Sequence, residues 1–164
     1  MSKNPIHFEQ LPNVDDLSGV IEDMFGVKLD ISGGWGYDNS APVIVNSLDI
    51  PIDQFLHMFA SIRANTEMNL YLEEKQRYGS INCNFIEGKQ VEIENQLFDM
   101  ITFEITAMKE IIYADLIDEY KENYGKNEEF DLEDHFKRRK ENTIKLETDF
   151  WFTGLEKYYV ENPQ

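Results

Sequence analysis

Residues 98–108 read Phe-Asp-Met-Ile-Thr-Phe-Glu-Ile-Thr-Ala-Met, and this stretch decides the fold class of the chain. At helical spacing, Leu97, Ile101, Ile105 and Met108 would share one face of a helix. At a period of two, the odd positions from 101 to 107 are apolar and alternate with Thr and Glu, as in a strand with one buried face. Because β-branched and aromatic residues are enriched here, the stretch predicts a strand.

The segments on the C-terminal side mix helical and extended patterns. Residues 109–124 predict a helix, because apolar residues recur four apart and Gly125 lies just past the end. A short charged helix is expected from residue 131 or 132 to residue 140. Residues 143–152 alternate in polarity and predict a strand, and residues 155–160 predict a last turn of helix.

The segments on the N-terminal side begin with an irregular lead-in over residues 1–13. A short helix is predicted over 14–25, with Asn13 as its N-cap and Gly26 as its stop signal. These signals place the first regular element after the lead-in rather than at the start of the chain.

The middle of the chain predicts further strands around one long helix. Residues 27–31 and 43–45 read as a hairpin with a glycine-rich connection. Residues 51–76 carry the clearest helical stripe. Residues 81–93 predict two short strands that turn at Glu87-Gly88-Lys89.

The order of these elements shows no steady βαβ rhythm and predicts an α+β fold with an antiparallel or mixed sheet packed against helices. We expect a single domain over residues 1–164, since no linker divides the chain. Apolar residues make up 41% and aromatic residues 13% of the chain, which is enough for a core and too much for the disordered class.

Cys83 is the only cysteine, so an internal disulfide is excluded and a small, partly buried thiol is expected. No apolar run approaches the roughly 18 residues of a membrane span, and the N-terminus has no signal-peptide pattern. These features predict a soluble, cytoplasmic protein. Its negative charge argues against direct binding to nucleic acid or to anionic membranes.

The net charge is −17, from 32 acidic and 15 basic residues, and it is unevenly distributed. Between Glu110 and Asp134 there are ten acidic residues and two lysines. Four of the acids lie three and four apart on one predicted helix face, where like charges repel. The stretch is either a solvated face or a docking face for a basic protein. The candidate contacts are Asp115, Asp118, Glu119, Glu122, Glu128 and Glu129.

A basic run, Lys137-Arg138-Arg139-Lys140, follows the acidic stretch at a predicted helix C-terminus. Positive charge complements the helix dipole at that end. We therefore interpret the run as a helix cap and an internal counter-charge rather than as a nucleic-acid site.

The glycine cluster at residues 33–36 does not fit a phosphate-binding loop, because no helix follows it directly and it has no lysine. Two interpretations remain. The glycines allow two backbone segments to approach closely while Trp35 packs inside, or Trp35 and Tyr37 are exposed aromatic anchors for a partner.

Catalytic and metal-binding patterns are absent from the sequence. Paired carboxylates are frequent, as in Asp15-Asp16 and Glu73-Glu74, but a chain this acidic produces such pairs by chance. The three histidines and Cys83 have no zinc-ligand spacing, and no calcium-loop pattern occurs. The sequence therefore predicts no cofactor, no metal and no enzymatic activity.

Three segments carry a resemblance to a known class of proteins. They are residues 33–37 leading into 43–45, residues 98–108, and Phe150-Trp151-Phe152. Together they resemble acidic α+β immunity proteins of bacterial polymorphic-toxin and contact-dependent inhibition systems. The resemblance implies a cytoplasmic, non-enzymatic protein whose ligand is a single toxin.

The functional hypothesis is therefore an acidic protein that neutralises a cognate basic toxin of the nuclease class by direct binding. Association with a basic groove would be fast and electrostatically steered. Three alternatives remain: a DNA-mimic inhibitor, a small metal-dependent enzyme with an acidic site, and a soluble domain whose charge serves solubility alone.

Overall fold

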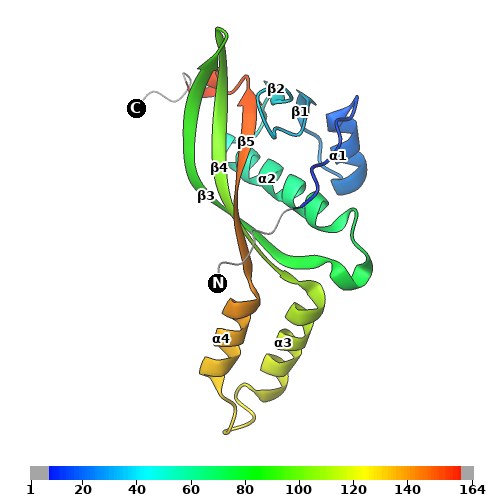
Figure 1. Cartoon of the computed structure of the whole chain (residues 1–164), viewed down its shortest axis with the longest axis vertical. Coiled ribbons are helices and arrows are strands. Elements are labelled where there is room, and N and C mark those ends of the chain that lie inside the picture. The colour runs from blue at the N-terminus through cyan, green and yellow to red at the C-terminus, as the bar shows by residue number, and fades with distance from the viewer. Residues whose placement is uncertain (1–7, 160–164) are drawn as a thin grey trace.

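The computed structural model describes residues 8–159, and it confirms an α+β fold built on one five-stranded mixed sheet (Figure 1). The strand order is β1-β2-β5-β4-β3. Neighbouring strands are antiparallel except for the parallel pair β2 and β5. The strands are β1 (Asp30–Gly33), β2 (Val43–Ser47), β3 (Tyr78–Ile93), β4 (Gln96–Lys109) and β5 (Ile144–Thr153).

The helices fall into two groups. α2 lies against one face of the sheet with α1 beside β1, whereas α3 and α4 project from the end of the sheet (Figure 1). The helices are α1 (Leu17–Phe25), α2 (Ile52–Asn69), α3 (Glu110–Asn123), α4 (Leu132–Asn142) and α5 (Glu156–Tyr159), with a 3₁₀ turn at Glu74–Gln76. None of the helices in the described part of the chain combines the length and the apolar character needed to cross a membrane.

β4 is the strand that residues 98–108 predict, and it lies between β3 and β5. Its odd-numbered side chains Ile101, Phe103 and Ile105 enter the core on the side of α2. The ring of Phe103 lies 5.6 Å from that of Phe150 on β5, and Phe59 of α2 lies 5.7 Å from Phe152. The strand interpretation of this stretch is therefore confirmed, because its β-branched and aromatic side chains pack on both neighbouring strands.

The predicted turn at residues 87–89 is wrong. β3 is one continuous strand, and Gly88 pairs with Ile101 inside the ladder. The chain reverses instead at Glu94 and Asn95, whose φ values of 52° and 67° make a two-residue hairpin loop. Both residues take the left-handed conformation that matches the twist of a tight hairpin.

Two helix boundaries differ from the sequence prediction. α1 starts at Leu17, because the carboxylate of Asp16 rather than Asn13 caps it by accepting a hydrogen bond from the Gly19 amide at 3.0 Å. α2 ends at Asn69 rather than at residue 76. Its end is followed by the short 3₁₀ turn, after which β3 begins. The stop at Gly26 is confirmed, with a φ of 70°.

The glycine cluster brings two parts of the backbone together. The Trp151 amide donates a hydrogen bond of 2.8 Å to the carbonyl of Gly36, and a Cβ at Gly36 would lie 2.9 Å from the carbonyl oxygen of Trp151. Trp35 is buried, and its indole donates to the carbonyl of Pro12 at 3.1 Å. The structural interpretation of the cluster is therefore confirmed.

Arg63 of α2 is fully buried between the core and the loop that follows β1. Its guanidinium donates to the Trp35 carbonyl at 3.2 Å and to the Asp149 carbonyl at 2.9 Å, and it pairs with Glu67 at 3.1 Å. The rings of Tyr37 and Phe150 lie 4.3 and 3.6 Å from its central carbon. One side chain thus connects α2 to β5 and to the loop that holds the glycine cluster at residues 33–36, which we call the glycine loop.

Candidate functional site

The acidic stretch of the sequence forms a helical hairpin, which we call the arm and define as residues 110–142. It leaves the sheet at the end of β4 and returns at the start of β5, so it is an insertion between two neighbouring strands (Figure 1). Gly125, with a φ of 74°, follows the end of α3. Asp131 caps α4 by accepting a hydrogen bond from the Asp134 amide at 3.0 Å.

The inner side of the arm is a small cluster of apolar and aromatic side chains around His135. Leu116 and His135 are buried, and His135 has no hydrogen-bond partner for either ring nitrogen among the described residues. The rings of Tyr120, Phe130 and Phe136 lie 5.6, 5.7 and 5.4 Å from the imidazole. The two helices are therefore held together by aromatic packing as well as by charge.

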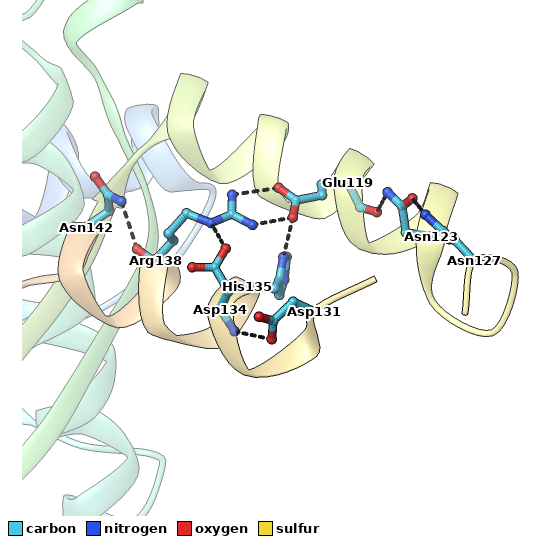
Figure 2. Close-up of polar contacts among 8 residues, drawn as sticks. All are labelled: Glu119, Asn123, Asn127, Asp131, Asp134, His135, Arg138 and Asn142. Atoms are coloured by element: carbon cyan, nitrogen blue, oxygen red, sulfur yellow. Dashed lines mark hydrogen bonds and ion pairs between the residues drawn. The ribbon is translucent and has the colours of Figure 1, made fainter. Parts of the chain in front are cut away.

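A second set of contacts between the helices is ionic (Figure 2). Arg138 donates from both terminal nitrogens to the carboxylate of Glu119, one of them at 2.7 Å, and from Nε to Asp134 at 2.9 Å. His135 Nδ1 lies 3.6 Å from Glu119. The hydrogen bonds from Arg138 hold the pKa of Glu119 below its usual range, and the two carboxylates raise the pKa of Arg138.

Glu119 is consequently not an unpaired contact for a partner. The sequence placed it on one face with Asp115, Asp118 and Glu122, but the structure turns it toward α4, where it pairs with Arg138. The basic run at 137–140 therefore contributes an internal counter-charge through Arg138, as predicted.

The outer face of α3 carries the remaining acids of that helix. Asp115, Asp118 and Glu122 are exposed, and none forms an ion pair with any residue from 8 to 159. Ile111 lies on the same face and is 52% exposed. This face thus combines unpaired negative charge with an exposed aliphatic side chain.

The tip of the arm adds two more acids and two aromatic side chains. Glu128 and Glu129 are exposed in the loop between the helices. Tyr124 is 54% exposed and stacks on Tyr120, with ring centroids 4.8 Å apart, while Phe136 of α4 is 47% exposed. Aromatic side chains next to charge are typical of interface anchors.

The prediction of an exposed aromatic anchor is wrong for Trp35. Trp35 is 2% exposed and cannot serve as a surface anchor. Tyr37 is half-buried, with its hydroxyl accepting a hydrogen bond from the Leu11 amide at 2.9 Å and its ring against Arg63. The surface aromatics of the arm, Tyr124 and Phe136, were missed because each lies in a helical stripe that reads as core in a sequence.

The described residues contain no group of three or more His, Cys, Asp and Glu side chains placed to hold a metal ion. Cys83 is half-buried, as expected, and burial raises the pKa of its thiol to about 11. At neutral pH it is therefore a thiol rather than the reactive thiolate.

Similarity to known proteins adds nothing to this geometry. No family model matches the chain, and no curated protein or solved structure shows significant similarity to it. The function has to be inferred from the residues and the fold of the chain itself.

Proposed function

We propose that the protein is a non-enzymatic immunity protein that acts in the cytoplasm and neutralises a basic toxin domain of the nuclease class through the arm. The observation that carries this proposal is the outer face of α3. There, three carboxylates without an ion-pair partner among residues 8–159 follow an exposed isoleucine along one helix face. The helical hairpin that carries them projects from the sheet (Figure 1).

The charge of the arm supports a basic partner. Like charges on one helix face lower the stability of that helix, and no basic residue between positions 8 and 159 pairs with the acids at 115, 118 and 122. A nuclease carries a basic substrate groove, and an acidic projection complements such a groove in both charge and shape. Charge complementarity of this kind mainly raises the association rate and fixes the partner.

The apolar side chains of the arm support a protein rather than a small ion as partner. Ile111, Tyr124 and Phe136 are each about half exposed although they are large and apolar. Removal of such groups from water gives roughly 25 cal/mol per Å² of apolar area, so they are suited to slow the dissociation of a complex. The charge of the arm is therefore expected to act on the association rate constant, and its apolar area on the dissociation rate constant.

The experiment follows from this division. A reading frame next to the gene is expected to encode a basic toxin domain whose toxicity is suppressed by co-expression of this protein. With that domain, the double substitution Asp118→Lys and Glu122→Lys should slow association about tenfold at low salt and flatten its salt dependence. Tyr124→Ala should instead raise the dissociation rate.

The matched control carries the same charge change on another helix. Glu22 and Asp23 are exposed on α1, so Glu22→Lys with Asp23→Lys alters the net charge equally without touching the arm. If both double variants slow association to the same extent, only the net charge matters and the arm is not the binding face. If co-expression gives no protection, the immunity function is wrong.

A further inference from the structure

A groove lies on the side of the sheet that carries α2, between the first half of α2 and the strands β3 and β4. Its volume is about 510 Å³, within the range of about 300–1,000 Å³ that small-molecule pockets occupy. A second hollow of about 290 Å³ shares Asp53, Leu56 and Phe85 with it and extends to His57 and Phe103. The two together form a continuous surface along one edge of α2.

Asp99 is the most buried polar residue of the groove lining, with 3% of its surface exposed. It lies on β4 in line with the core residues Ile101 and Phe103, at a position where the strand otherwise carries apolar side chains. Its Oδ1 accepts a hydrogen bond of 3.1 Å from the hydroxyl of Tyr159. Its Oδ2 is buried and has no hydrogen bond of good geometry to any residue between 8 and 159.

A buried carboxylate oxygen without a donor costs free energy unless a ligand or a proton satisfies it. Burial raises the pKa of Asp99, whereas the hydrogen bond from Tyr159 and the nearby amide side chain of Gln90 lower it, and the charge of Glu156 raises it further. A donor that carries positive charge would satisfy the oxygen and compensate the charge at once.

The charges around the groove are mainly negative. Burial raises the pKa of Tyr159, and the charges of Asp99, Glu156 and Asp53 raise it further, so these carboxylates act on the same place. Lys89 is the basic residue of the lining, but its ammonium group pairs with Glu87 at 3.4 Å. The local field therefore favours a cation.

The walls of the groove are apolar. Ile52 and Leu56 of α2 face Phe85 and Ile101 of the strands, and Gly88 leaves room where any side chain would crowd Ile101. A Cβ at Gly88 would lie 3.0 Å from the Cδ1 of Ile101. An apolar body of a few carbon atoms fits against these walls.

We propose that this groove binds a small molecule with a primary ammonium group on an apolar body, the ammonium group pairing with Asp99 and the body lying between α2 and β3. The site is independent of the arm. Ten residues of β4 separate Asp99 from Lys109, a distance of about 33 Å along an extended strand. The function proposed for the arm can fail while this inference holds, and the reverse.

The experiment uses the full chain and three probes that share one phenethyl body and differ in the charge of the head group. Phenethylamine is titrated against ¹⁵N-labelled protein, with 2-phenylethanol and 3-phenylpropionate as the neutral and anionic counterparts. The amine should shift the amide signals of Gly88, Gln90, Asp99 and Ile101. It should bind at least tenfold more tightly than the alcohol, and the carboxylate should not bind.

Three variants test whether Asp99 is the carboxylate that pairs with the ammonium group. Asp99→Asn keeps the shape of the side chain and should weaken amine binding at least tenfold, with little change for the alcohol. Asp118→Asn makes the same charge change on the arm and should leave amine binding unaltered. Asp53→Asn, at an exposed position of α2, should weaken the amine by a smaller factor and covers the case in which Asp99→Asn fails to fold.

The selectivity of the unmodified protein is itself decisive. Equal affinity for the amine and the alcohol, or no shift of the amide signals at millimolar amine, overturns the proposal without recourse to any variant.

A comparison with Nα-acetyl-lysine N-methylamide distinguishes the source of the ammonium group. A free amine as ligand predicts weaker binding of this compound, because its peptide backbone does not fit between α2 and β3, whereas equal or tighter binding identifies a lysine side chain instead.

Discussion

Arg63 shows at the scale of a single residue how one buried charge determines the arrangement of its neighbours. Its side chain is fully buried, and its donors reach backbone carbonyls in the glycine loop and in β5. Burial lowers the pKa of Arg63, whereas the charge of Glu67 raises it. In return, Arg63 opposes the effect of burial on the pKa of Glu67, which is raised. Each of these two buried side chains therefore depends on the other to remain charged.

Replacement of Arg63 by Met should lower the free energy of unfolding by about 3–5 kcal/mol, because a buried carboxylate and two carbonyls lose their donor. Urea denaturation followed by circular dichroism measures this change. Arg138→Met is the control, since that arginine pairs with acids in contact with solvent, and its loss should be much smaller. Equal losses in the two variants would contradict the assignment of Arg63 as a central contact.

The ion pair of the arm predicts a pH dependence. Hydrogen bonds from Arg138 lower the pKa of Glu119 in the folded protein, so its stabilising contribution is complete above its unfolded pKa of about 4.3. That contribution is lost as the pH falls through the lower, folded value. His135 and Asp134 face the same pair.

Amide hydrogen exchange in α3 and α4 should therefore accelerate, relative to the sheet, between about pH 5 and about pH 3. Glu119→Gln should loosen the arm at neutral pH and reduce this part of the acid response. Asp134→Asn is the control, because Asp134 is the second carboxylate that pairs with Arg138. An arm that keeps its protection to the lowest pH would show that the pair contributes nothing.

At the scale of the element, the β3–β4 hairpin shows where local sequence signals fail. The glycine at 88 reads as a turn, yet it lies inside β3 and pairs with Ile101 of β4, whose side chain fills the space beside it. The actual loop, Glu94 and Asn95, carries a residue with a side chain at both left-handed positions. Cross-strand pairing along the rest of the hairpin decides the register.

The loop predicts a stabilising double substitution. Glu94→Asn with Asn95→Gly places residues that favour positive φ at both positions, and it should raise the free energy of unfolding by about 1 kcal/mol. Urea denaturation measures the change. Glu92→Asn, at an exposed strand position outside the loop, should not stabilise the protein. A loss of stability in the double variant would mean that the two φ values carry no strain.

At the scale of the whole molecule, the net charge of −17 acts against the folded state. The repulsion is long-range, so salt screens the part of it that acts beyond a Debye length, which is about 10 Å at 0.1 M. The six ion pairs of Lys and Arg within the described part of the chain include only one that is largely buried, that of Arg63 and Glu67. Screening should therefore remove more repulsion than attraction.

The thermal midpoint of unfolding should accordingly rise by about 2–5 °C when the salt concentration is raised from about 0.02 M to about 0.3 M. Scanning calorimetry at neutral pH measures this shift. The double variant Asp118→Lys with Glu122→Lys should show a smaller rise, because part of the repulsion is already removed. A falling midpoint would show that the surface ion pairs outweigh the repulsion.

The sequence alone determined the fold class, the strand character of residues 98–108, the helical character of the arm and the concentration of acid in it. Each of these follows from periodicity and composition, which are properties of neighbouring residues. Only the tertiary structure decided that Trp35 is buried, that Glu119 pairs with Arg138, and that Asp99 lies in a groove beneath α2. These three outcomes depend on contacts between segments far apart in the chain, and no local pattern encodes such contacts.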